Sequence, residues 1–163
     1  MFLFEILAGI LLADLASSFV HWGQDNLGSK DTPLVGYIIE AGAGHHEDPE
    51  KFLHSSFWYR SRDALIGSAI VLILGLLTIG PSVFLFSLCA AGAYMIEIQV
   101  WAHTQKRPLW VRILQKIGLF QSPEQHEKHH SVDDTQTYAI ITSWLNPWLD
   151  KSGIWTYLAR YKS

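Results

Sequence analysis

The sequence predicts an all-α integral membrane protein with three transmembrane helices, interfacial helices and a histidine-rich cap on one face of the bilayer. The 163-residue chain is 49% hydrophobic but only 17% charged, whereas soluble domains average about 25% charged residues. Long apolar segments contain no Lys or Arg, and all eight histidines fall outside those segments or at their ends. The length predicts a single domain over residues 1–163.

The first predicted span lies near 2–20, where nearly every residue is apolar. At about 1.5 Å per residue, this segment can cross a hydrocarbon core of about 30 Å. A cleaved signal peptide is the alternative, but it would start with a positive charge. This segment carries Glu5 and neither Lys nor Arg, which favours a span.

Two further spans are predicted near 64–79 and 82–102, separated by Gly80-Pro81, which is a turn signal. The alternative is a soluble protein with a buried helical hairpin. Buried helices rarely exclude every basic residue over such lengths, so the membrane interpretation is favoured.

Two other apolar stretches are predicted to be amphipathic helices at the membrane interface, at 108–118 and 137–160. The second is not expected to span the membrane, because polar residues such as Asn146 and Asp150 interrupt it.

The charge distribution predicts the orientation. All twelve Lys and Arg lie in 21–63 or 104–163, two segments that three spans place on the same side. The positive-inside rule makes that side cytoplasmic, so the histidine-rich face is expected there. The net charge is −3, without the basic stripe of a nucleic-acid-binding protein, so no nucleic-acid partner is expected.

Helical spacing groups several histidines. Ser122-Pro123 is typical of an N-cap followed by the first residue of a helix. A helix that begins there carries His126, His129 and His130 on one face.

A polar stripe follows the first span at i, i+4, i+7 and i+11: Asp14, Ser18, His21 and Asp25. Such a stripe must face protein or water rather than lipid. Asp25 is expected to orient His21 through its second ring nitrogen. Asp14 is expected either to support the same site or to pair with another span.

Eight histidines on one side, with the single Cys89 in an apolar run, favour a metal site over scattered surface histidines. Eight imidazoles exceed the needs of one tetrahedral zinc and suit two ions with about four ligands each. Imidazole binds Zn, Fe, Cu and Ni alike, so the ligand type leaves the metal open.

Several motifs, in this order, resemble the Kua/CarF lipid desaturase family from about residue 14 to residue 155. They are His21-Trp22-Gly23-Gln24-Asp25-Asn26-Leu27-Gly28, Gly44-His45-His46-Glu47-Asp48-Pro49, Gln99-Val100-Trp101-Ala102-His103-Thr104, Ser122-Pro123-Glu124-Gln125-His126-Glu127-Lys128-His129-His130 and Thr142-Ser143-Trp144-Leu145-Asn146-Pro147. Members of this family form the vinyl ether of plasmalogens or desaturate palmitate on phosphatidylglycerol in chloroplasts.

The resemblance implies an O₂-dependent desaturase with two iron ions. Gln99 stands where the family often has a histidine, which implies a position beside the metals. The implied iron ligands, through which catalysis would occur, are His21, His45, His46, His54, His103, His126, His129 and His130.

The expected reaction removes two hydrogens from a membrane glycerophospholipid chain near its glycerol end, with an ether-linked chain slightly favoured over an acyl chain. The alternatives are an acyl-lipid desaturase of the plant chloroplast type, a di-iron lipid hydroxylase and a metal-binding membrane protein without enzymatic activity. No haem, flavin or iron–sulfur signature is present, so an external donor, cytochrome b5- or ferredoxin-like, is expected to supply electrons.

Overall fold

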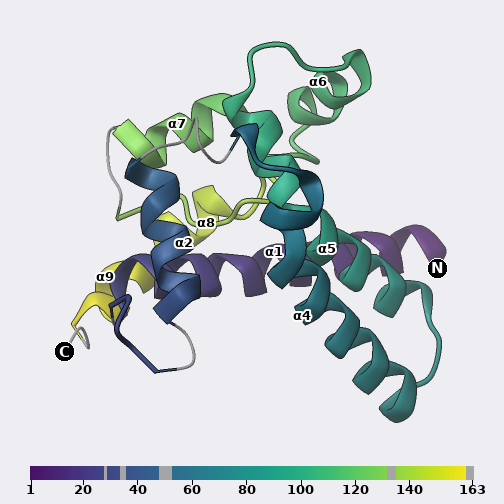
Figure 1. The fold of residues 1–163 in the computed structure, drawn as a ribbon. Helices are drawn as coiled ribbons and strands as arrows, with labels where there is room; N and C mark the ends of the chain where they lie inside the picture. Colours follow the sequence, from purple (N-terminus) through teal and green to yellow (C-terminus); the bar gives the residue numbers. More distant parts are fainter. Residues whose placement is uncertain (28, 34–35, 48–52, 132–134, 161–163) are drawn as a thin grey trace.

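The computed structural model of the chain describes residues 1–27, 29–33, 36–47, 53–131 and 135–160, without the side chains at 41, 43–47 and 131. Within these residues the fold is entirely helical, without strands, which confirms the expected class (Figure 1). The helices are α1 Phe2–Asn26, α2 Gly36–Glu47, α4 Phe57–Thr78, α5 Val83–His103, α6 Leu109–Lys116, α7 Pro123–Ser131, α8 Asn146–Ser152 and α9 Ile154–Ala159.

Three helices, α1, α4 and α5, are long and apolar enough to cross a membrane. The α4–α5 hairpin turns at Gly80, whose φ of 76° is readily adopted by glycine. Ser82 caps α5, and its hydroxyl accepts a hydrogen bond from the Leu85 backbone N–H. In the same way Ser56 caps α4, so this helix begins about two turns before the predicted apolar boundary near residue 64.

The three long helices are joined by close packing and by one ion pair. At Gly9 of α1, an added Cβ would lie 2.6 Å from the Phe84 carbonyl oxygen of α5, so only glycine allows this approach. Near the other end of α5, Glu97 pairs with Arg60 of α4, and both side chains are 12% exposed. These contacts fix α5 between α1 and α4, with its C-terminal end directed towards α7 (Figure 1).

The segment 137–142 is buried and forms no helix, which corrects the helix predicted over 137–160; only α8 and α9 are helical there. Side chains from elsewhere satisfy its backbone. Asp14 accepts from the Ile141 N–H at 2.8 Å, and Asn146 bonds both the N–H and the carbonyl of Ala139, each at 2.8 Å. Because these partners replace the hydrogen bonds of a helix, the segment can thread through the core without one.

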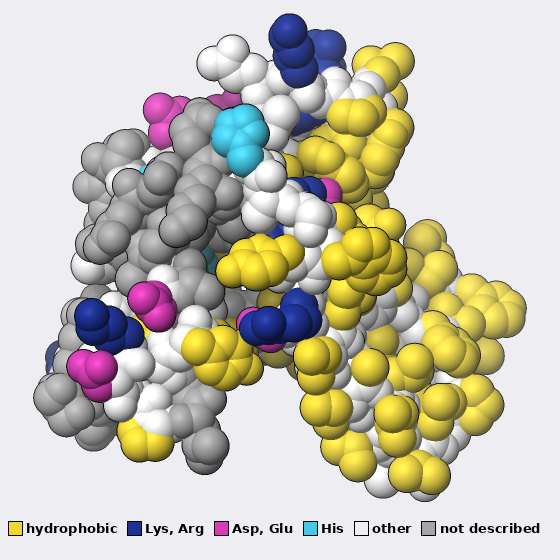
Figure 2. Space-filling view, viewed as in Figure 1, with side chains coloured by type: hydrophobic (Ala, Val, Ile, Leu, Met, Phe, Trp, Pro, Cys, Tyr) yellow, Lys and Arg dark blue, Asp and Glu magenta, His cyan; other side chains and the backbone are white. Residues whose placement is uncertain are grey.

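The outer surface separates into apolar and polar parts. Figure 2 shows apolar side chains covering the α4–α5 hairpin and the side of α6. On α6, which falls within the predicted interfacial stretch 108–118, Leu109, Trp110, Ile113 and the following Ile117 are all exposed. This arrangement is typical of a helix that lies along a membrane surface.

Candidate metal centre

Helix α7 positions the histidines of its motif. Ser122 caps it, because its hydroxyl accepts from the Gln125 N–H at 3.3 Å, and Pro123 is its first residue, as predicted. The sequence also places Gln125 where a capping box would direct its side chain back to the Ser122 N–H, but this side chain donates to the Ser143 carbonyl instead. The helix is thereby fixed to the C-terminal segment.

The first histidine cluster consists of His103 at the end of α5 and of His126 and His130, one turn apart on α7. The Nε2 atoms of His126 and His103 are 2.7 Å apart, and those of His126 and His130 are 3.1 Å apart. All three residues offer ligand atoms within 4.8 Å of one another. His126 is buried, so this cluster is partly closed to solvent.

The second histidine cluster consists of His21, Asp25 and His129. His21 Nε2 lies 3.5 Å from Asp25 Oδ2, and His129 Nε2 lies 3.4 Å from the same oxygen. The Asp25 side chain is 14% exposed and that of His129 is fully buried. The two clusters adjoin, because the rings of His129 and His130 are 5.6 Å apart between centroids.

Backbone carbonyls orient both rings of the second histidine cluster. His21 Nδ1 is 3.1 Å from the Tyr138 carbonyl oxygen, and His129 Nδ1 is 2.6 Å from the Gln136 carbonyl oxygen. A carbonyl only accepts hydrogen bonds, so each Nδ1 must donate. Asp25 was expected to orient His21 from the ring nitrogen that does not bind metal, but the Tyr138 carbonyl occupies that position at Nδ1. Asp25 faces Nε2 instead, the nitrogen directed into the cluster.

Both clusters have the donor chemistry of a cation site. In a neutral imidazole whose Nδ1 carries the proton, Nε2 presents a lone pair. In the second histidine cluster two such lone pairs meet one carboxylate oxygen, and in the first three Nε2 atoms converge. Lone pairs at these distances repel unless a proton or a metal ion lies among them. His, with carboxylate and no thiolate, is a donor set that iron accepts.

Thr137 lies between the two orienting carbonyls and has a φ of 68°. For a β-branched residue this left-handed conformation is strained. Thr137 is buried, and its N–H donates to Asp150 at 3.0 Å. The surrounding structure therefore holds this residue in a costly conformation at the point where two histidines are oriented, a feature that the sequence did not indicate.

Asp14 supports the site indirectly. Its buried carboxylate accepts from the N–H groups of Ile141 and Thr142 and from the Thr142 hydroxyl, the last at 2.6 Å. The partner of Asp14 is thus the segment 137–142 and not another span. That segment carries the Tyr138 carbonyl, so Asp14 helps to fix the acceptor of His21.

The other predicted site residues have different positions. His45 and His46 belong to the last turn of α2, but their side chains lie outside the described residues. His54 is exposed and belongs to neither cluster of described residues. Gln99 is buried on α5, one turn before His103.

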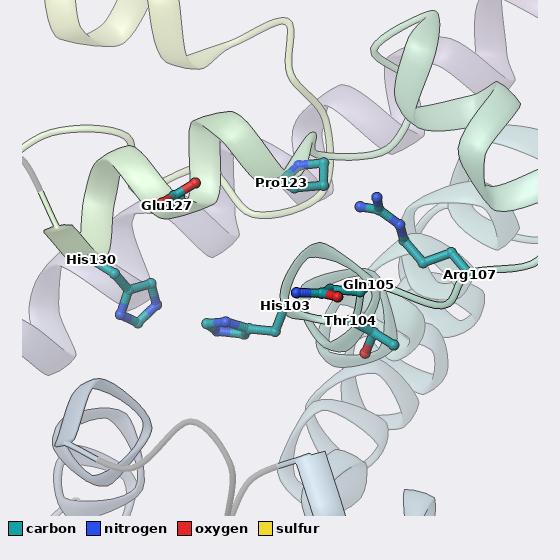
Figure 3. A pocket seen from close by; sticks show the side chains of 7 residues that line it. All are labelled: His103, Thr104, Gln105, Arg107, Pro123, Glu127 and His130. Carbon is teal, nitrogen blue, oxygen red and sulfur yellow. The ribbon is translucent and has the colours of Figure 1, made fainter.

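A cavity of about 400 Å³ opens beside the first histidine cluster. His103 and the loop after it, including Arg107, form one wall, and Pro123, Glu127 and His130 form the other (Figure 3). Arg107 was not singled out from the sequence, where it is one basic residue among several. Its position beside the histidines depends on the fold.

Comparison with known proteins identifies a family. Residues 10–161 match the family model described as the lipid desaturase domain. No solved structure matches the chain.

Three relatives illustrate the family. A protein of Acanthamoeba polyphaga mimivirus, named as a probable fatty acid desaturase, is 32% identical over 96% of this chain and 80% of its own length. Plasmanylethanolamine desaturase 1 of Mus musculus is 32% identical over 94% of this chain and 62% of its own length. Chloroplastic fatty acid desaturase 4 of Arabidopsis thaliana is 34% identical over 93% of this chain and 48% of its own length. The chain thus spans only about half to two thirds of the mouse and plant relatives.

Proposed function

Because this chain belongs to the lipid desaturase family, we propose that it is a membrane non-haem di-iron desaturase. The proposed reaction uses O₂ to remove two hydrogens from a glycerophospholipid chain near its glycerol end, with vinyl-ether formation as in plasmanylethanolamine desaturase. The observation that carries the proposal is the pair of adjoining histidine clusters, each of which could hold one metal ion.

The proposed iron ligands are the six residues of the two clusters, supplemented by His45 and His46 from the end of α2. When bound, the iron ions would supply O₂ activation and hydrogen abstraction from an unactivated C–H bond, which no side chain can perform alone. The chain itself would orient the ligands through the Gln136 and Tyr138 carbonyls and exclude water around the buried His126 and His129. His54 is left out of the proposed set because it is exposed and belongs to neither cluster of described residues.

The position of the ligands supports a reaction near the glycerol end. His21 lies close to the C-terminal end of α1, and His103 is the last residue of α5. If these helices cross the bilayer, both ligands lie near one surface, next to headgroups and far from the ends of the lipid chains. The first carbons of a glycerol-linked chain then reach the metals most easily.

An acyl-lipid desaturase of the plant chloroplast type is the second candidate, because the Arabidopsis relative named fatty acid desaturase 4 is 34% identical. In both cases electrons would come from an external donor, cytochrome b5- or ferredoxin-like. Both reactions share the metal centre and differ in the linkage of the lipid chain, so the products distinguish them.

The test is expression of the chain in cells that lack plasmalogens and are fed 1-O-alkyl glycerolipid. Acid-labile vinyl ether should appear in the lipid extract, disappear with His130→Ala and persist with the control His54→Ala. A double bond found only in acyl chains would favour the second candidate. A double bond formed deep in a free or thioester-linked fatty acid would contradict both.

A further inference from the structure

Arg107 carries buried nitrogen atoms without a partner. Its Nε and Nη1 are inaccessible to solvent, and neither has a hydrogen-bond partner within the described part of the chain. Arg107 as a whole is half-buried, but two buried N–H donors without hydrogen bonds are costly, because they lose water and gain nothing in return. Buried donors of this kind normally have a partner, so an acceptor such as water or an anion is expected beside Arg107.

The guanidinium faces the cavity that adjoins the metal centre. Figure 3 shows it at one side, near Pro123, while the rings of His103 and His130 face each other farther along. Both rings belong to the first histidine cluster. An anion on Arg107 would therefore lie in the same cavity as two proposed iron ligands.

The nearby carboxylates leave Arg107 available. Glu127 lines the opposite wall, on the exposed side of α7. The pKa of the Glu124 carboxyl is lowered, first by hydrogen bonds to its own backbone N–H and to Ser122, and to a smaller extent by the Arg107 charge. The charge of Arg107 thus lowers the pKa of Glu124, but no carboxylate among the described residues forms an ion pair with the guanidinium.

The location also suits a lipid headgroup. Arg107 comes two residues before α6, whose Leu109, Trp110 and Ile113 are exposed. Apolar and tryptophan side chains on such a helix are typical of the membrane interface, where lipid phosphates lie. A planar guanidinium can form two parallel hydrogen bonds to a phosphate, a geometry that lysine lacks.

On the basis of the proposed function, we propose that Arg107 binds the phosphate of the substrate phospholipid and so sets which chain carbons reach the first histidine cluster. If the phosphate is bound at a fixed point, the distance from that point to the metals determines which carbons of the lipid chain are oxidised. The specificity for a bond near glycerol would then depend on the separation of Arg107 from His103 and His130. Neutral glycerolipids of the same chain length would lack this anchor.

The experiment measures binding of two matched lipids by the purified full chain in phosphate-free detergent, and their turnover when O₂ and a reduced cytochrome b5- or ferredoxin-like donor are added. One is 1-O-alkyl-2-acylglycerophosphoethanolamine, and the other is 1-O-alkyl-2-acylglycerol, which lacks the phosphate. Arg107→Gln should weaken binding of the phospholipid and raise its KM by about tenfold or more. Binding of the neutral lipid should change less than about twofold. Arg107→Lys should restore part of the affinity.

Controls separate the possible causes. Arg112→Gln removes an equivalent charge from the exposed face of α6 and should leave the KM unchanged. Metal content should be equal in wild type and Arg107→Gln, which shows that the centre is intact; if it falls, Arg107→Lys serves for the comparison. Inorganic phosphate is the second probe, and it should compete with the phospholipid only weakly.

Three results would overturn the inference. They are an equal loss for both lipids, an unchanged KM for the phospholipid, and Arg107-dependent binding of inorganic phosphate that the phospholipid does not displace. If the wild type forms no double bond but still binds phospholipid through Arg107, the proposed function fails while the phosphate site stands.

Discussion

His21 and His129 meet edge to face with their ring centroids 4.6 Å apart, and both direct Nε2 towards the same carboxylate oxygen of Asp25. Behind them, carbonyls two residues apart in sequence accept from the two Nδ1 atoms. Both rings are thus held in one tautomer, with their lone pairs directed inward. This relationship couples the C-terminal segment of the chain to its first helix.

The first prediction concerns Asp25. Asp25→Asn should lower the metal content from about two ions per chain to about one, because a neutral amide does not offset the charge of a cation between His21 and His129. Elemental analysis of the purified protein measures this. Asp63→Asn, an exposed carboxylate paired with Arg62 on α4, is the matched control. Equal metal content in both variants would show that Asp25 is not a ligand.

The second prediction tests the strained backbone at Thr137. Thr137→Gly should keep the metal content of the wild type, since glycine readily adopts a φ near 68°. Thr137→Pro should lower it, because proline fixes φ near −65° and removes the N–H that donates to Asp150. In the proline variant, the fixed φ and the lost hydrogen bond would each displace the Gln136 and Tyr138 carbonyls. Unchanged metal binding there would mean that these carbonyls do not orient the histidines.

The third prediction separates a structural role of Asp14 from a ligand role. Asp14→Asn should destabilise the protein by about 1–3 kcal/mol, because an amide cannot accept all three hydrogen bonds from Ile141 and Thr142. Thermal unfolding in detergent measures this loss, and Asp31→Asn in the exposed loop is the control. The folded fraction of Asp14→Asn should retain its metal. A metal-free but fully stable variant would instead place Asp14 among the ligands.

The fourth prediction concerns the orientation in the membrane. Single cysteines are introduced into a Cys89→Ser background and labelled in intact cells with an impermeant reagent. A cysteine at the exposed Pro81 should react from outside, and a cysteine at Asp31 should react only after permeabilisation, because the positive-inside rule predicts that the histidine segments face the cytoplasm. The reverse pattern would contradict the predicted orientation.

Much of the fold was predictable because the spans are long apolar runs free of basic residues. The Gly80-Pro81 turn, the cap of α7 and the three histidines on α7 were also correct, and the predicted family and enzyme class, a lipid desaturase, are confirmed by the family match. The non-helical segment 137–142 was not predictable, because its conformation depends on Asp14 and Gln121, which are distant in the sequence, as well as on the nearby Asn146. The polar residues Asp14 and Asn146, which stand in apolar stretches of the sequence, were the available indication that a buried segment needs side-chain hydrogen bonds.

The division of the histidines between two clusters was also not predictable from the sequence. His126, His129 and His130 share one stretch of helix, yet His129 turns to His21 while the other two turn to His103. The acceptors that orient His129 and His21 are the backbone carbonyls of Gln136 and Tyr138, which leave no trace in residue identity. A prediction from spacing alone can therefore name ligands but cannot assign them to separate ions.

The most direct test of two separate ions is the iron content of the purified protein and three single variants. The wild type should contain about two iron ions per chain. His103→Ala and His129→Ala, which each remove a ligand from a different cluster, should each lower this to about one, whereas His54→Ala should not change it. Stoichiometric zinc without iron after growth in iron-replete medium, or an equal loss of iron in all three variants, would contradict the two-cluster di-iron centre.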